Sequence, residues 1–140
     1  MPTRGAMTRE NYILLARFRY RLRRFLAFSE HAARQAHLAP QQHQALLAVA
    51  GHEDAEGPAV GDIAERLQIE QHSAVGLLNR LEMEGFVERK RDAHDHRRSR
   101  IHLTQRGWSV LEGLSAAHQA EIESIAPTLK DLLDRIAPDG

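Results

Sequence analysis

Two short amphipathic segments, separated by a very tight joint, constrain the fold of this chain more than any other feature. Apolar residues recur in both at spacings of three and four, as on one face of a helix. They are Val60, Ile63, Ala64 and Leu67 in the first segment and Ala74, Leu77, Leu78 and Leu81 in the second. Only QIEQ lies between them, and Gly85 is suited to end the second helix. Two short helices so closely joined predict a helix-turn-helix.

After Gly85 the periodicity changes to one typical of strands. Phe86-Val87 and Ile101–Leu103 are short apolar runs on either side of a polar, charged stretch. They predict a β-hairpin with a long tip, and the tip contains RKRDAHDHRRSR, Arg89 to Arg100. This stretch holds five Arg and one Lys against two Asp. A helix-turn-helix followed by a hairpin with a basic tip predicts a winged helix.

Helical patterns flank this region on both sides. Residues 8–36 predict a long helix, because their apolar residues also recur at spacings of three and four. Pro40 suits the first turn of a further helix that ends near Ala50. From Gln105 the pattern is helical again, and we expect Pro127 to separate or kink two helices there. The fold class that follows is mainly α with a small β-hairpin wing (α+β).

Charge is sorted along the chain although its total is zero, with 19 Lys and Arg against 19 Asp and Glu. Residues 1–36 hold eight Arg against two Glu (+6), and residues 37–85 hold two Arg against eight acids (−6). Residues 86–106 hold seven basic residues against three acids (+4), and residues 107–140 hold two against six (−4). A neutral total argues mildly against a nucleic-acid partner, but one positive block coincides with the predicted hairpin.

Several classes of protein are excluded by what the sequence lacks. It has no Cys, which excludes disulfides, zinc–thiolate sites and thiol-based redox sensing. It has no signal-peptide pattern and no apolar run of membrane-spanning length, so we expect a soluble, cytoplasmic protein. It also lacks a Gly-rich phosphate loop and a GxSxG elbow, and His94-Asp95 has no fitting set of further metal ligands. We therefore expect no enzyme activity.

In a winged helix, a basic hairpin tip is suited to contact DNA. The second helix of such a motif fits the major groove of DNA, which is about 12 Å wide. An Arg on the hairpin can enter the narrow, electronegative minor groove beside it. The alternative is that Arg89–Arg100 is only a solvated charged loop, and the hairpin context favours contact with DNA.

The residues VGDIAERLQIEQHSAVGLLNRLEMEGFVERKRDAHDHRRSRIHLTQRG, 60–107, preceded by LAPQQHQALLAV, carry a family resemblance. Their most specific parts are NRLEMEGFVER and the wing pair Asp95-x-Arg97, followed seven residues later by Thr104 in LTQRG. In these motifs, and in its helical layout, the chain resembles the MarR family of winged helix-turn-helix transcriptional regulators.

The resemblance implies a single MarR-like domain, residues 1–140, with a winged helix-turn-helix at 37–106 and dimerisation helices at 8–36 and 107–140. It implies a homodimer that binds a pseudo-palindromic operator in double-stranded DNA, and we expect a repressor rather than an activator. Many members of this family release the DNA when they bind a small-molecule effector, but no motif identifies its pocket here. No cofactor is implied.

The resemblance also implies the residues that contact DNA. The family's wing Arg falls on Arg97, with Asp95 as its orienting partner. Of the nearby Arg98 and Arg100, one could instead pair only with Asp92 or Asp95, and Arg98 is retained as a candidate. The contacts of the recognition helix fall on His72, Ser73, Val75, Gly76, Asn79 and Arg80.

Departures from the family pattern put the operator sequence in doubt, not the fold. Val75 and Gly76 stand where polar or basic residues are frequent, and His72 replaces a small hydroxyl residue. Gln68 occupies a turn position where Gly is frequent, and Ala39 replaces an N-cap Thr, at a cost of about 1 kcal/mol.

Other interpretations of these residues remain open. Arg80 could pair with Glu84 one helical turn away instead of contacting phosphate. The Arg-rich helix within 8–36 could bind phosphate, but pairing with the acidic C-terminal helices across a dimer fits its charge better. Nine His raise the alternative of a metal-responsive regulator, although His94 and His96 match no ligand motif and we expect no metal. A further alternative is a winged helix that binds only proteins.

Overall fold

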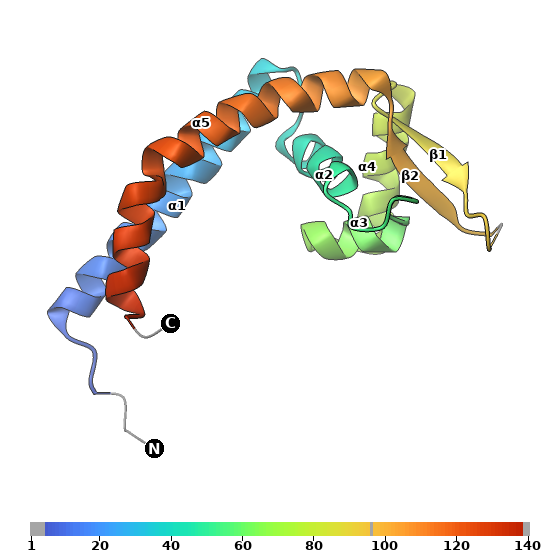
Figure 1. Cartoon of the computed structure of the whole chain (residues 1–140). Helices are drawn as coiled ribbons and strands as arrows, with labels where there is room; N and C mark the ends of the chain where they lie inside the picture. Colours follow the sequence, from blue (N-terminus) through green and yellow to red (C-terminus); the bar gives the residue numbers. More distant parts are fainter. Residues whose placement is uncertain (1–4, 96, 139–140) are drawn as a thin grey trace. The chain divides into compact units, whose positions relative to one another are not determined.

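The computed structural model describes residues 5–95 and 97–138 and contains five helices and one two-stranded sheet within them (Figure 1). In chain order the elements are α1 (Arg9–Gln35), α2 (Pro40–Ala50), α3 (Val60–Leu67), α4 (Gln71–Met83), β1 (Val87–Arg91), β2 (Ser99–Leu103) and α5 (Gln105–Ile136). The predicted mainly helical fold with a β-hairpin is confirmed. No helix in this described part combines the length and the apolar character that a membrane span requires.

The chain forms two compact units. One joins the N-terminal stretch through His31 to the stretch from Ala116 onward, and the other is Ala32–Ser115. The helix-turn-helix and the hairpin both lie in the second unit, where α3 packs on α2 and α4, and β2 packs on α2.

The helix-turn-helix is held by the apolar stripe of α4. Its four stripe residues, Ala74, Leu77, Leu78 and Leu81, are at most 2% exposed. Burial of one Leu side chain contributes about 1.5–3 kcal/mol, so this stripe determines which face of α4 turns inward. The apolar residues that the sequence places on one face of this helix are therefore the ones that α4 contributes to the core.

Two left-handed residues end the helices of this motif. Gln68, with φ of 56°, follows α3, and its Nε2 donates a hydrogen bond of 2.7 Å to the carbonyl of Glu65. This backbone conformation favours Gly, so Gln68 is strained relative to a Gly at the same position. Gly85, with φ of 81°, follows α4, and the amide of Phe86 donates to the carbonyl of Leu81 at 2.9 Å. The predicted role of Gly85 in ending α4 is confirmed.

The two alanines that precede α2 and α3 have no capping side chain of their own. The amide of Ala39 donates to Oε1 of Gln42 at 2.9 Å, and the amide of Ala59 donates to Oδ2 of Asp62 at 2.9 Å. A side chain one turn later thus accepts the hydrogen bond of the N-cap amide, which offsets part of the cost of the missing cap.

The hairpin is longer than its apolar runs. β1 and β2 pair antiparallel from Val87 opposite Leu103 to Arg91 opposite Ser99. The prediction that all of Arg89–Arg100 forms the tip is wrong, because its first three residues and its last two lie within paired strands. Backbone pairing continues past the apolar runs because it depends on main-chain groups rather than on side-chain polarity. The tip is confined to the residues between Arg91 and Ser99.

The other unit is built on α1 and α5, which lie side by side. His118 of α5 packs its ring against Phe25 and Phe28 of α1, with ring centroids 5.9 and 5.5 Å apart. Its Nε2 lies 2.8 Å from Oγ of Ser29. These contacts join helices that are far apart in the sequence.

α5 continues through Pro127, so of the two expectations, a separation or a kink, the separation into two helices is wrong. Proline removes one backbone donor and disfavours a helix interior. The apolar residues Ile125, Leu129 and Leu132 nevertheless keep helical spacing across it, and Leu132 is buried. Packing of this continuous stripe outweighs the local cost of the proline.

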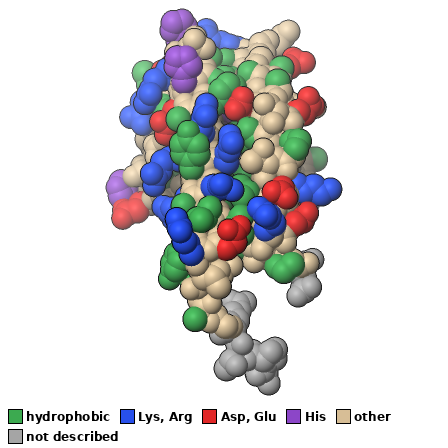
Figure 2. Space-filling view, turned by 90° about the vertical axis from the view of Figure 1, so that its left-hand side faces the viewer, with side chains coloured by type: hydrophobic (Ala, Val, Ile, Leu, Met, Phe, Trp, Pro, Cys, Tyr) green, Lys and Arg blue, Asp and Glu red, His purple; other side chains and the backbone are tan. Residues whose placement is uncertain are grey.

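Basic and apolar side chains share the exposed surface of α1. Figure 2 shows Lys and Arg side chains interspersed with hydrophobic ones over one face of the molecule. Exposed large apolar residues in this unit include Tyr12, Leu15, Tyr20, Leu22 and Leu26 on α1 and Ile122 and Leu133 on α5. A surface of this kind is unusual for a chain that stays alone in water.

Candidate nucleic-acid interface

α4 turns an uncovered face away from its buried stripe. The six residues of α4 that are predicted to contact DNA lie on this side: five are exposed and Gly76 is half-buried. They are His72, Ser73, Val75, Gly76, Asn79 and Arg80. A Cβ added to Gly76 would meet nothing within 4 Å, so packing within the chain does not require a Gly there.

Asn79 is held by the neighbouring strand. Nη2 of Arg89 in β1 donates a hydrogen bond to Oδ1 of Asn79, and Nε of Arg89 lies 3.6 Å from Oε2 of Glu82. Arg89 is therefore a link between α4 and β1, with a side chain that is 27% exposed. The sequence interpretation placed Arg89 in a free tip, because nothing local in the sequence indicates that α4 lies beside β1.

The alternative pairing of Arg80 with Glu84 does not occur. Oε2 of Glu84 accepts a hydrogen bond from Nε2 of Gln42 at 2.9 Å, which draws that carboxylate toward α2. Within the described residues Arg80 makes no ion pair shorter than 4.0 Å. Its charge is free to meet an external anion.

The wing tip exposes its predicted Arg residues. The side chain of Arg97 is 93% exposed, and its Nε lies 3.5 Å from Oδ1 of Asp95. The same carboxylate oxygen accepts the backbone N–H of Arg97 at 3.0 Å. Arg98 is also exposed, and its amide donates to the carbonyl of Asp95 at 3.0 Å. Asp95 thus has the geometry of an orienting partner for Arg97.

Arg100 behaves differently from Arg97 and Arg98. Its Nε donates to Oδ2 of Asp92 at 2.8 Å and its Nη1 donates to the carbonyl of Gly57 at 3.0 Å. This settles the choice between Arg98 and Arg100 as the partner of Asp92. The backbone N–H of His94 and the guanidinium of Arg100 together lower the pKa of Asp92 to about 2. Asp92 is therefore ionised at neutral pH.

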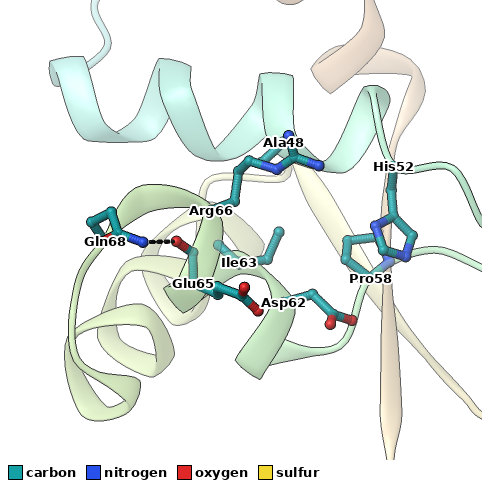
Figure 3. A pocket seen from close by; sticks show the side chains of 8 residues that line it. All are labelled: Ala48, His52, Pro58, Asp62, Ile63, Glu65, Arg66 and Gln68. Carbon is teal, nitrogen blue, oxygen red and sulfur yellow. Dashed lines mark hydrogen bonds between the residues drawn. The ribbon is translucent and has the colours of Figure 1, made fainter. Parts of the chain in front are cut away.

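A polar hollow of about 380 Å³ lies between α2 and α3 (Figure 3). Two of its charged lining residues take part in local hydrogen bonds. Oδ2 of Asp62 accepts the amide N–H of Ala59, and the backbone carbonyl of Glu65 accepts Nε2 of Gln68. Arg66 lies along Ala48 of α2 in the same view. The hollow does not gather residues of a recognisable catalytic or metal-binding set.

The described His residues are not placed as ligands of one ion. Within the described residues no group of three or more His, Asp or Glu could hold a metal. His94 is exposed, and His96 lies outside the described residues. A separate hollow of about 500 Å³ beside Trp108 is lined by Leu47 and Leu111 and is mainly apolar.

Comparison with known proteins finds a family that is similar to the helix-turn-helix region of this chain. The family model described as MarR family matches residues 38–98, which contain α2, α3, α4 and the first strand of the wing. The chain is similar to the MarR family over these 61 of its 140 residues. The MarR motifs around Gly85 and the wing pair Asp95-x-Arg97 lie within this region.

A curated relative is similar to part of the chain. Over 55 residues the chain is 38% identical to the uncharacterized HTH-type transcriptional regulator YfiV of Bacillus subtilis (strain 168). This match covers 39% of the chain and only 34% of that protein's length.

Solved structures of MarR-type proteins share the fold along most of the chain. AbsC, a MarR family transcriptional regulator from Streptomyces coelicolor, superposes with a TM-score of 0.73 at 17% identity, over 96% of this chain and 93% of AbsC. The S. aureus MepR–DNA complex gives a TM-score of 0.67 at 24% identity, over 89% of this chain and 86% of MepR.

Proposed function

We propose that this protein is a DNA-binding transcriptional regulator that acts as a homodimeric repressor in the cytoplasm and has no enzymatic activity. The observation that carries the proposal is the wing: Arg97, with a 93% exposed side chain, lies on the same unit as the uncovered face of α4. A protein of this fold, MepR, is known in complex with DNA.

In the proposed complex α4 lies in the major groove. His72, Ser73, Val75, Gly76 and Asn79 face base edges, and Arg80 meets a phosphate. The open space beside Gly76 allows the backbone of α4 to approach the DNA closely. Arg97 and Arg98 contact the backbone or the minor groove next to it, with Asp95 orienting Arg97.

The proposed dimer joins the residues 8–36 and 107–140 of two copies. The unit of α1 and α5 has an apolar groove of about 470 Å³, lined on α1 by Leu22 and Phe25 and on α5 by Ile122, Ile125, Leu129 and Leu133. A second copy would cover these residues and place the basic α1 beside the acidic end of α5. Two recognition helices would then read half-sites about 34 Å apart.

Regulation by a small molecule fits the same arrangement. An effector that binds more tightly to a dimer with mismatched spacing releases the DNA in proportion to its difference in affinity for the two states. Its chemical identity is not specified by the residues described above.

The first experiment is fluorescence anisotropy with the protein and DNA from upstream of its own gene, titrated with salt. We expect saturable binding to this DNA, little binding to a scrambled duplex, and an affinity that falls steeply with salt. Arg97→Ala should weaken binding about tenfold and reduce the salt slope by about 1. Arg66→Ala removes the same charge from α3, at an exposed residue that is not among the proposed DNA or dimer contacts, and serves as the matched control.

Failure to bind any duplex in an unbiased selection of DNA sequences at low salt would contradict the proposal. It would favour the alternative of a winged helix that binds a protein. Binding that appears only after addition of a divalent metal would favour the metal-responsive regulator instead.

A further inference from the structure

Arg100 and Asp92 form an ion pair at the base of the wing tip, and both side chains are withdrawn from solvent. The Arg100 side chain is 17% exposed and that of Asp92 is 5% exposed, whereas that of Arg97 is 93% exposed. Nε of Arg100 donates to Oδ2 of Asp92 at 2.8 Å. The buried positions and the short distance distinguish this pair from the solvated pairs elsewhere on the hairpin.

The same Arg ties the wing to the loop between α2 and α3. Nη1 of Arg100 donates to the carbonyl of Gly57 at 3.0 Å and lies 3.9 Å from Oδ2 of Asp54. Beside it the amide of Ile101 donates to the carbonyl of Pro58 at 2.9 Å. Gly57 has φ of 90°, and a Cβ there would lie 2.4 Å from the carbonyl oxygen of Ile101. The loop and β2 are therefore in close backbone contact at this point.

Asp92 in turn holds the wing tip. Its Oδ1 accepts the amides of His94 at 2.7 Å and Asp95 at 3.2 Å, and its own amide donates to the carbonyl of Arg98 at 3.0 Å. Asp95 then accepts the amide of Arg97. A continuous series of hydrogen bonds thus runs from the loop carbonyl of Gly57 to the Arg at the tip.

From this geometry we infer that Arg100 and Asp92 are positioning residues of the wing, which hold the tip so that Arg97 reaches DNA while neither of them touches it. The inference rests on the proposed DNA-binding function. It assigns opposite roles to basic residues only three positions apart: Arg97 is a contact, and Arg100 is an internal link.

Charge alone and positioning predict opposite results for Asp92→Asn. Removing an acid next to DNA should strengthen binding, because the protein becomes more positive. Under the positioning role, the side chain of Asn has only one acceptor oxygen, so it cannot serve both Arg100 and the backbone amides of the tip as Asp92 does. Binding to DNA should then weaken about fivefold to tenfold, approaching the loss of one Arg contact. Glu53→Gln removes the same charge at an exposed position of the loop between α2 and α3, outside the wing and outside the proposed dimer contacts, and is the matched control. Binding as tight as or tighter than wild type would overturn the inference.

A double-mutant cycle tests whether Arg100 acts through Arg97. In the wild type, Arg97→Ala should weaken DNA binding about tenfold. In an Arg100→Gln background the same substitution should weaken it only about twofold, because Arg97 is already misplaced and the two changes are not independent. Arg100→Lys keeps the charge and should restore part of the affinity. If Arg97→Ala weakens binding by the same factor in both backgrounds, Arg100 makes a separate contact with DNA, and the inference is overturned.

A measurement without DNA separates this inference from the proposed function. Water–amide exchange measured by NMR should become several-fold faster at His94 and Asp95 in both Asp92→Asn and Arg100→Gln, while the amides of α4 exchange as in the wild type. Unchanged exchange at the tip would overturn the inference even if the wild type binds DNA. If the wild type binds no DNA but the two variants show the faster exchange, the DNA-positioning role is overturned together with the proposed function, and the link itself is established.

Discussion

At the scale of single residues, the environment of Asp92 makes its protonation part of the stability of the wing. Its carboxylate accepts the amides of His94 and Asp95 and pairs with Arg100. These interactions favour the charged form, and they lower the pKa from 3.8 to about 2. Ionised Asp92 therefore stabilises the folded state at every pH above its ordinary value.

The sign of the resulting pH dependence follows from linkage. Because the folded pKa lies below the unfolded one, the contribution of Asp92 is fully present above about pH 3.8 and is lost as the pH falls toward 2. We expect the difference in melting temperature between the wild type and Asp92→Asn to be constant above this window and to shrink within it. Thermal unfolding followed by circular dichroism measures this difference. A difference that grew on acidification would contradict the assigned hydrogen bonds.

At the scale of elements, two glycines of α5 differ in the space around them. Gly107 is buried in the first turn, and a Cβ on it would lie 2.2 Å from the carbonyl oxygen of Phe86. Gly113 is exposed, and a Cβ on it would meet nothing within 4 Å. The first lets α5 start close to the end of α4, and the second has no packing function in the chain.

The two alanine substitutions should therefore change stability in opposite directions. Gly113→Ala should raise the free energy of unfolding by about 1 kcal/mol, since Ala is the better helix former. Gly107→Ala should lower it by about 1–3 kcal/mol, because the added methyl forces a backbone to shift. Urea denaturation of both variants gives the two values. A gain in stability from Gly107→Ala would show that α5 and Phe86 are not in the described contact.

At the scale of the whole molecule, charge and exposed apolar surface both favour association of two copies. Residues 1–36 have a net charge of +6 and residues 107–140 one of −4. The groove between α1 and α5 leaves Leu22 41%, Ile122 49% and Leu133 50% exposed. Such a surface would be covered in the proposed homodimer.

Sedimentation velocity tests this assembly directly. We expect the wild type to sediment as a dimer, and Leu133→Glu to shift it toward monomer because a charge would be buried in the apolar groove. Met83→Glu also replaces an exposed apolar residue by an acid, but on α4, where Met83 is 86% exposed, and it should leave the dimer intact. A monomeric wild type at micromolar concentration would contradict the proposed dimer.

The sequence by itself determined the order and kind of the elements. The stripe of α4 and the left-handed Gly85 are encoded by residues within one or two turns of each other, so periodicity and turn chemistry were sufficient to predict them. The expected separation into two helices at Pro127 was wrong, because apolar residues on both sides of it continue the helical stripe.

Only the tertiary structure decided which basic residues of the hairpin are free. Arg89 is bound by Asn79, and Arg100 by Asp92 and the carbonyl of Gly57, which is 43 positions away in the chain. Arg97 stays exposed. All three are Arg residues within twelve positions of each other, and the residues next to them in the sequence do not show which of them is paired. Their roles differ because folding brings an acceptor from a distant segment to two of them and leaves the third in solvent.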